Sequence, residues 1–298
     1  MIFISTLHNP YQNLALEHAL FQNTQAPSLF LYVNTPCVVI GRAQNPWIEA
    51  NLAYMQQRQI PLLRRQSGGG TVVHDLGNLN FSFMSPTAHY DKQQHLRIVL
   101  KALHDLGIPA TVNERHDLML QGKKISGSAF RETRDHCFHH GTLLIESDLP
   151  ALREALAAPP LKIKTNAVPS VRSAVMNLCD FKADLSMQQM QSQLITAFSL
   201  HHQFTIAPTL LDETALDSPL AQTALSLYQS QEWLYHKTLP FEEQREVNGQ
   251  IVTLYVEQGV IMRCVPLLSE CEAWIGTEFA VLAIFPSPFA EEGRVEGG

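Results

Sequence analysis

Apolar residues recur at helical spacing in four segments of the first two-thirds of the chain. These segments span residues 13–21, 93–106, 149–158 and 186–200. The first predicts a short amphipathic helix. In the second, the residues that share one face are Leu96, Val99, Leu100 and Leu103. Gly107 suits the end of that helix, because glycine tolerates the left-handed conformation that often closes a helix.

Short runs rich in β-branched and aromatic residues lie between these helices and predict strands. They span residues 29–33, 37–41, 62–63, 71–74, 80–83, 117–120, 124–128 and 141–147. Turn signals occupy residues 34–36, 75–78 and 121–123, and the second of them predicts a hairpin between the strands that flank it. Helices between strands with hairpin-length connections predict the α+β class, with a large domain whose mainly antiparallel sheet is flanked by helices.

The last third of the chain predicts a second, smaller unit. A proline-led polar segment at residues 159–164 is expected to be a loop inside the large domain. A boundary near residues 201–210 then divides the chain into a large domain over residues 1–205 and a small C-terminal α+β domain over residues 206–298. Residues 251–265 predict a hairpin in the small domain. Residues 290–298 predict a disordered tail.

Composition narrows the class of protein. The chain has 298 residues, of which 45% are hydrophobic, and this suffices for a sizeable core. Its formal net charge of −7 argues against nonspecific binding of nucleic acid, which needs many cations to neutralise phosphates. No segment approaches the length of an apolar membrane span, and no signal peptide is expected. The five cysteines form no C-x-x-C pair, which is typical of a cytoplasmic protein with free thiols.

The most informative run covers residues 64–75, where two arginines precede three consecutive glycines and a β-branched segment. Glycine loses the most backbone freedom on folding, so such a run is costly unless the backbone approaches something closely or takes a positive φ. The run predicts that an anionic or acylated small molecule lies against bare backbone N–H groups. A tight loop between strands is the alternative. Five cations are expected to form a local basic pocket: Arg64, Arg65, Lys123, Lys124 and Arg131.

Five runs carry a resemblance to a known family. They are Gly-Arg-Ala-Gln-Asn-Pro-Trp at 41–47, Arg-Gln-Ser-Gly-Gly-Gly at 65–70, Lys-Ile-Ser-Gly-Ser-Ala at 124–129, His-His-Gly-Thr-Leu-Leu at 139–144 and Ser-Val-Arg-Ser at 170–173. With these runs in this order, the chain resembles the lipoate–protein ligases of the biotin and lipoate ligase superfamily. The resemblance spans about the first two-thirds of the chain. Gln66 and Cys137 depart from the family pattern, and the C-terminal part is shorter than in the longest bacterial ligases.

The resemblance implies an ATP-dependent activity. Such a ligase activates lipoate to lipoyl-AMP with ATP and Mg²⁺, releases pyrophosphate, and passes the lipoyl group to a lysine of a carrier protein. The implied carriers are the lipoyl domains of 2-oxoacid dehydrogenase acyltransferase subunits and the H protein of the glycine cleavage system. The sequence leaves open whether lipoate or octanoate is preferred. It contains neither G-x-x-x-x-G-K-[ST] nor G-x-G-x-x-G, so ATP enters through the resemblance alone.

The resemblance also implies roles for individual residues. Lys124 is the catalytic candidate, because its ammonium could reach both the acyl carbonyl oxygen and the phosphate of an acyl-adenylate. Lys123 is expected on the opposite strand face. The nucleotide would be lined by Arg65, Gly70, Thr71, Val72, Val73 and Lys124. The acid would be lined by Glu17, Ser67, Gly69, His74, Arg131 and His140. The metal ligands stay unknown, with Glu17, Arg131 and Asp117 as weaker candidates for the pocket wall or a magnesium site.

Three other readings stay open. A cysteine-dependent octanoyl or lipoyl transferase of the same superfamily would need an activated thiolate, for which Cys37, Cys137 and Cys179 are conceivable. A biotin ligase would want a differently lined pocket. A non-catalytic protein that binds lipoyl domains would more readily lack Lys124 or the glycines. Zinc is not expected at His139 and His140, because adjacent residues of a strand point to opposite faces.

Overall fold

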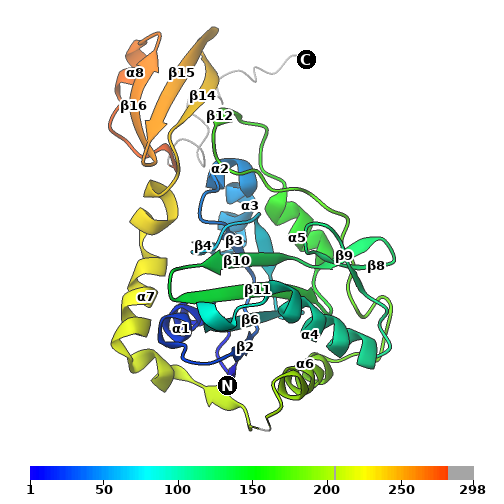
Figure 1. The fold of residues 1–298 in the computed structure, drawn as a ribbon. Helices are drawn as coiled ribbons and strands as arrows, with labels where there is room; N and C mark the ends of the chain where they lie inside the picture. Colours follow the sequence, from blue (N-terminus) through cyan, green and yellow to red (C-terminus); the bar gives the residue numbers. More distant parts are fainter. Residues whose placement is uncertain (205, 281–298) are drawn as a thin grey trace.

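A six-stranded sheet forms the centre of the molecule, with helices on both of its faces (Figure 1). The computed structural model describes residues 1–204 and 206–280. The strands of the sheet lie in the order β10 (Ser128–Glu132), β11 (His136–Leu144), β6 (Asn78–Pro86), β2 (Ser28–Tyr32), β1 (Ile2–Ser5) and β13 (Thr209–Leu211). The ladders from β10 to β2 are antiparallel, and those joining β2, β1 and β13 are parallel. The predicted α+β class with a mainly antiparallel sheet is confirmed.

Two helix pairs cover the sheet. Helices α4 (Lys92–Asp105) and α6 (Met187–His201) pack on one face, where they bury an aliphatic core with β1, β2, β6 and β11. Helices α1 (Pro10–Asn23) and α7 (Pro219–Gln229) pack on the other face. Of the four residues predicted for the core face of α4, Leu96, Val99 and Leu103 are buried, whereas Leu100 is only partly buried at the edge of that core. Gly107 takes a φ of +77° just beyond the helix.

Helix α1 differs from its prediction as an amphipathic helix. Residues 13–17 are all buried, and five consecutive positions cover every face of a helix. The reason is its position between the large sheet and α7, which leaves no broad side for solvent. The buried residues include the polar side chains of Asn13 and Glu17, which therefore need partners inside the protein.

A second sheet of three strands carries the glycine-rich segment. Its order is β4 (Leu62–Arg64), β3 (Cys37–Ile40) and β5 (Val72–His74). The predicted hairpin between β5 and β6 is wrong, because β5 pairs with β3 while β6 pairs with β2 and β11. At the turn between them, Gly77 O accepts hydrogen bonds from Ile145 N and Glu146 N at 2.9 and 3.0 Å. The turn is thereby tied to the end of β11, and the chain crosses from one sheet to the other instead of folding back.

Short helices and a third small sheet complete the surroundings of the glycine-rich segment. Helices α2 (Pro46–Glu49), α3 (Leu52–Gln57) and α5 (Leu149–Leu156) lie beside the second sheet. The third sheet contains β7 (Thr111–Val112), β8 (Leu118–Leu120) and β9 (Lys123–Ser126), with a turn (η1, Thr87–His89) elsewhere before α4. The predicted strand–turn–strand around residues 121–123 is confirmed by the antiparallel pairing of β8 and β9.

The C-terminal part builds a fourth sheet, in the order β12 (Lys162–Thr165), β14 (Phe241–Val247), β15 (Gln250–Glu257) and β16 (Val260–Val265), with helix α8 (Ser269–Glu272). The predicted hairpin over residues 251–265 is confirmed. The predicted loop over residues 159–164 is wrong in its second half, because β12 pairs with β14. An isolated Lys-Ile-Lys run carries too few residues to reveal a strand whose partner lies about eighty positions away.

The division of the chain at residues 205 and 206 stays a prediction. Contacts cross it in both directions: β12 joins the C-terminal sheet, whereas β13 joins the large sheet and α7 packs on α1. Two helical turns, η2 (Glu213–Asp217) and η3 (Glu232–His236), flank α7. The predicted disordered tail lies outside the described residues. Within the described part of the chain, no helix combines the length and apolar character needed to cross a membrane.

Candidate active site

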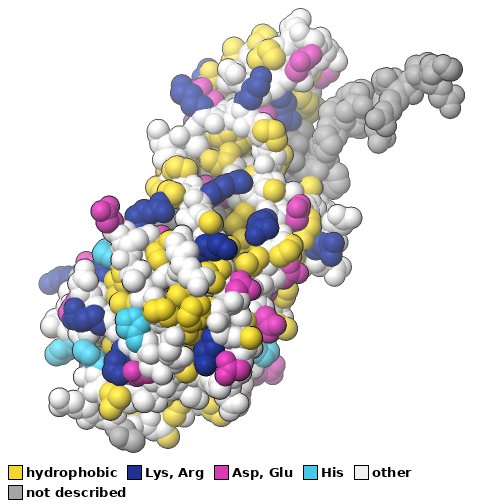
Figure 2. All heavy atoms as spheres, turned by 90° about the vertical axis from the view of Figure 1, so that its right-hand side faces the viewer, with side chains coloured by type: hydrophobic (Ala, Val, Ile, Leu, Met, Phe, Trp, Pro, Cys, Tyr) yellow, Lys and Arg dark blue, Asp and Glu magenta, His cyan; other side chains and the backbone are white. Residues whose placement is uncertain are grey.

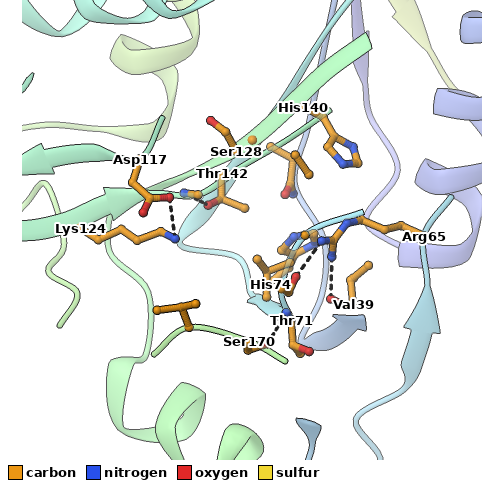
Figure 3. Close-up of a pocket in the computed structure, with 18 of the residues that line it drawn as sticks. Val39, Arg65, Thr71, His74, Asp117, Lys124, Ser128, His140, Thr142 and Ser170 are labelled. Atoms are coloured by element: carbon orange, nitrogen blue, oxygen red, sulfur yellow. Dashed lines mark hydrogen bonds and ion pairs between the residues drawn. The ribbon is translucent and has the colours of Figure 1, made fainter. Parts of the chain in front are cut away.

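A cavity of about 320 Å³ lies between the glycine-rich segment, strands β9 to β11 and residues 168–171 (Figure 3). Eight of the residues predicted for the site line it: Arg65, Gly69, Gly70, Thr71, Val72, His74, Lys124 and His140. Four do not: Glu17, Ser67, Val73 and Arg131. The weaker candidate Asp117 also lines it. Motifs that lie up to about one hundred positions apart in the sequence therefore line one cavity.

Backbone contacts explain the glycines. A Cβ atom on Gly41 would lie 2.2 Å from Gly69 O, and one on Gly70 would lie 3.1 Å from Ser170 Oγ. Gly69 also takes a φ of +83°, in the left-handed region that favours glycine. The segment after β4 can therefore fold tightly against β3 only if these positions carry no side chain.

Arg65 holds the conformation of this segment by hydrogen bonds to its backbone carbonyls. Its Nη2 donates to Gly68 O at 2.6 Å and to Gly70 O at 2.7 Å, and its Nη1 donates to Val39 O at 3.1 Å. Burial lowers the pKa of the guanidinium to about 10. Most of its donors are thus used by the protein itself, and its positive charge remains beside the cavity.

Lys124 and Asp117 form an ion pair at the cavity wall, 2.9 Å apart between Nζ and Oδ1 (Figure 3). Lys124 is held by its backbone on a second side, where its N donates to Ala174 O and its O accepts from Met176 N. A Cβ on Gly127 would lie 3.3 Å from Lys124 Nζ, so the glycine leaves room for the ammonium. Lys123 is exposed, as expected for the neighbouring position of a strand.

His140 connects the cavity to a buried polar chain. Its Nε2 lies 2.7 Å from Ser67 Oγ, and its Nδ1 lies 3.0 Å from Glu17 Oε1. Burial favours a higher pKa for Glu17, but the charge of His140 and hydrogen bonds from His140, Ser82 and Tyr32 outweigh it, and the pKa is lowered. Glu17 and Ser67, predicted to contact the acid, contact His140 instead and do not line the cavity.

Of the remaining predicted residues, His74 lines the cavity, whereas Arg131 and Val73 do not. His74 lines the cavity, and burial together with the charge of Arg65 lowers its pKa to about 3, so the ring is neutral. Arg131 lies away from the cavity, where its guanidinium bonds to Gln66 Oε1 and covers the ring of Phe21 at 5.2 Å. Val73 packs in an apolar cluster with Val38 and Ile40 on the far side of β5. Alternation along the strand explains why Val72 faces the cavity and Val73 does not.

The wall opposite Lys124 is largely apolar. Leu14, Tyr32, Val39 and Ala129 line it beside His140. An aliphatic chain placed there would be removed from water, and each buried methylene is worth about 0.8 kcal/mol. The cavity thus joins a cationic, polar end to an apolar end.

The expected basic pocket does not form as a group of five. Arg64 is fully buried and donates to Leu234 O, at 2.6 Å from Nη2, and to Thr238 Oγ1 at 2.9 Å. It ties β4 to the segment that follows α7. Of the five cations, Arg65 and Lys124 line the cavity. The sequence could not separate two adjacent arginines, which lie on opposite faces of the chain.

The sequence reasoning missed Glu49. This buried carboxylate lies on α2 and accepts hydrogen bonds from Thr71 and Ser170, both of which line the cavity. The only signal was the Asn-Pro pair at 45–46, which predicts the start of a helix, with an acidic residue in its first turn. That pattern says nothing about which loops the helix contacts.

The described residues bring neither a cysteine nor a cluster of metal-ligating side chains to the cavity. The part of the cavity wall that the structure describes includes no cysteine. Burial raises the pKa of the Cys37 and Cys179 thiols, which opposes thiolate formation. Among residues 1–204 and 206–280, no group of three His, Cys, Asp or Glu side chains could hold a metal ion.

Comparisons with known proteins agree on one family. A model of the lipoyl protein ligase A/B catalytic domain matches residues 9–199. A protein of Psychrobacter cryohalolentis named lipoate-protein ligase A is 40% identical over 269 residues, which cover 86% of this chain and 78% of that protein.

Two solved structures extend the likeness to the fold. P. falciparum LipL1 in complex with lipoate has a TM-score of 0.73 and 25% identity, over 93% of this chain and 90% of that one. A structure of lipoate-protein ligase A bound with ATP has a TM-score of 0.67 and 28% identity, over 78% of this chain and 96% of that one.

Proposed function

Because this chain belongs to the lipoyl protein ligase A/B family, we propose that it is an ATP-dependent lipoate–protein ligase. It activates lipoate to lipoyl-AMP and transfers the lipoyl group to lysines of carrier proteins. The observation that carries the proposal is the placement of Lys124 in a cavity whose other wall is apolar. An anionic carboxylate and an anionic phosphate need a shared cation, whereas the lipoyl tail needs an apolar surface.

In the first step, a lipoate carboxylate oxygen attacks the α-phosphorus of ATP. A bond forms between these atoms, the bond from the α-phosphorus to the bridging oxygen breaks, and pyrophosphate leaves. Lys124 Nζ offers N–H donors to the acyl carbonyl and α-phosphate oxygens, where negative charge must be stabilised. Asp117 holds the ammonium in position at 2.9 Å. The glycine-rich segment offers backbone rather than side chains to the nucleotide.

In the second step, the amine of a carrier lysine attacks the acyl carbonyl carbon. An amide bond forms, the bond from that carbon to the AMP oxygen breaks, and AMP leaves with the electron pair of that bond. The proton lost by the amine passes to the phosphate of the leaving AMP. His74 stands in this wall as a neutral ring, and both ring nitrogens of His140 are already engaged by Ser67 and Glu17. We propose that this wall shields the acyl-adenylate from water until the carrier arrives.

Mg²⁺ fits the same site through Asp117, the carboxylate that lines the cavity among the described residues. Mg²⁺ keeps several waters and usually takes one or two carboxylates together with substrate phosphates, so a larger protein cage is unnecessary. When bound, the ion would neutralise the charge of the leaving pyrophosphate. Asp117 would then hold the ion as well as pairing with Lys124.

Positive charge on the molecular surface also favours a polyphosphate. Figure 2 shows Lys and Arg side chains gathered across the middle of one face of a chain with a formal net charge of −7. Exposed cations on β9, α5 and the neighbouring loops include Arg115, Lys123, Arg153 and Arg172. Clustered charge of one sign raises the local concentration of an oppositely charged ligand. Carriers with lipoyl domains, such as those of 2-oxoacid dehydrogenases or the H protein, would receive the product.

The test is lipoate-dependent exchange of labelled pyrophosphate into ATP, followed by transfer to a lipoyl domain. Exchange that requires both lipoate and Mg²⁺ supports the proposal. A protein that shows no exchange but transfers octanoyl groups from an octanoylated carrier would instead be an acyltransferase.

A further inference from the structure

Among the residues that the structure describes, Glu49 is a buried carboxylate without a cationic partner. It closes helix α2, and 7% of its surface is exposed. Across residues 1–204 and 206–280, the ion pairs of the protein do not include it. A buried charge is costly unless hydrogen bonds compensate it, so its donors are the feature to explain.

Three donors surround the Glu49 carboxylate, and they come from the two segments that flank the cavity. Its Oε1 accepts from Ser170 N at 3.0 Å. Its Oε2 accepts from Ser170 Oγ and lies 3.1 Å from Thr71 Oγ1, whose single proton is shared with Gln44 Oε1 at 2.9 Å. One side chain therefore joins α2, the glycine-rich segment and residues 168–171.

The donors require a group that only accepts hydrogen bonds. Ser170 Oγ already accepts from Thr71 N at 2.8 Å and from Gln44 Nε2 at 2.9 Å, so its single proton is left for Glu49. A glutamine at position 49 has one oxygen. If that oxygen accepts from Ser170 N, the amide NH₂ faces Ser170 Oγ, whose proton also points toward it. If the oxygen accepts from Ser170 Oγ, the amide NH₂ faces Ser170 N, which is another donor. Either orientation leaves a buried donor unpaired.

Residues 168–171 have little else to hold them. Val168, Pro169 and Val171 are exposed, so apolar burial contributes little to the position of this segment. Its other anchors are Val168 N to Ala43 O at 3.2 Å and Gln44 Nε2 to Val168 O at 3.3 Å. The hydrogen bonds at Ser170 are shorter and include one to a charged group, which makes them the stronger set.

We propose that Glu49 is a positioning residue that latches residues 168–171 onto the glycine-rich segment and so fixes the two walls between which ATP binds. It contacts Thr71 and Ser170, which line the cavity, and it does not line the cavity itself. The kinetic part of this inference rests on the proposed ligase function. The structural part, the latch, does not.

The latch is tested by limited trypsin cleavage after Arg172, an exposed residue that follows the segment. Without ligands, Glu49→Gln should be cleaved at this bond about tenfold faster than the unchanged protein, because a hydrogen bond to a charged group is lost. Glu154→Gln, at an exposed position on α5, is the matched control and should leave the rate unchanged. In a Ser170→Ala background the donor conflict disappears, so adding Glu49→Gln should change cleavage little. Equal cleavage of Glu49→Gln and unchanged protein would overturn the latch, and so would an equal effect of Glu49→Gln in both backgrounds.

Kinetics then separate positioning from general stabilisation. Glu49→Gln should raise KM for ATP about tenfold, because the wall that receives ATP must first be ordered, and should leave KM for lipoate near its original value. A rise of both KM values together with a lower midpoint of global unfolding would assign Glu49 a structural role only. If the unchanged protein shows no lipoate-dependent exchange, the proposed function fails, and the cleavage experiment still decides the latch.

Discussion

Ser67 Oγ and His140 Nε2 lie 2.7 Å apart, and Glu17 holds the other ring nitrogen of His140. This spacing is that of a serine, histidine and acid relay. Ser67, however, is 1% exposed, and its oxygen also accepts from Arg65 Nε at 2.9 Å. A serine this deeply buried cannot contact a substrate. The hydrogen bonds instead connect Glu17 of helix α1, through His140 and Ser67, to Arg65.

Because of this network, replacing Glu17 should greatly reduce the stability of the fold. Glu17→Ala should lower the free energy of unfolding by about 3 kcal/mol, because removing one partner of a buried pair strands the other. Ser67→Ala should cost about 1 kcal/mol, the value of one hydrogen bond. Urea denaturation of both variants, with the exposed Glu154→Ala as control, measures these costs. A Glu17→Ala protein as stable as the control would show that the network contributes nothing.

The catalytic prediction concerns the choice between two adjacent lysines. Lys124→Ala should slow lipoyl-adenylate formation by about 10² to 10³, the usual loss for one preorganised donor at a developing charge. Lys123→Ala should remain near the unchanged rate, because its side chain is exposed on the other face of β9. Single-turnover formation of lipoyl-AMP is the measurement. The reverse pattern would mean that the wrong lysine has been assigned.

Much of this arrangement was predictable from sequence, and the limits have physical causes. Strong periodicity located α4 and the β8–β9 turn, since both depend on local residue spacing. The partners of β5 and β12 were not predictable, because pairing depends on where distant strands lie. Motifs identified Lys124 and the glycines, but not that Arg131 would turn to Gln66 and Phe21, or that Glu49 would lie beneath Thr71.

Part of the acid sensitivity of the fold should arise from His95, a histidine outside the cavity. Burial lowers the pKa of His95 from 6.5 to about 4, and its ring stacks on Phe83 at 4.8 Å. The unfolded chain binds more protons between these pKa values, so this stabilisation is complete above pH 6.5 and is lost as the pH falls toward 4. The loss amounts to about 3 kcal/mol. His95→Phe keeps the stacking and should lower the slope of stability against pH over this range by about 1.4 kcal/mol per pH unit in denaturant titrations. Burial also lowers the pKa values of His74, His139 and His202, which keep the remaining slope. An unchanged slope would count against His95 as a source.

No cysteine should be required for activity. Cys37, Cys137, Cys264 and Cys271 are buried, and burial raises the pKa of Cys264 to about 12. A variant with these four changed to Ala and Cys179→Ser should retain lipoate-dependent exchange and transfer, at some cost in stability from lost packing. A single Cys→Ser change that abolishes transfer in a folded protein would revive the acyltransferase reading.

The C-terminal sheet should support activation more than transfer, and the packing of Trp47 gives the reason. Trp47 lies on α2, two positions before Glu49, and its ring packs against Phe241 at 5.3 Å and Phe279 at 5.1 Å. Removing that sheet would loosen α2, and with it the latch on the wall that receives ATP. Transfer from preformed lipoyl-AMP demands less of that wall.

The design of the truncation follows from the buried arginine. Ending the chain after Gln203 would remove β13, α7 and two of the hydrogen-bond acceptors of Arg64, Leu234 O and Thr238 Oγ1, so that protein should not fold. Ending it after Thr238 keeps them. The longer variant should lose lipoyl-AMP synthesis at least tenfold more than transfer from supplied lipoyl-AMP, a difference of about 1.4 kcal/mol. Trp47→Ala in the full chain should reproduce the same imbalance more weakly. Equal losses in both half-reactions, on soluble protein, would mean that the sheet only covers apolar surface.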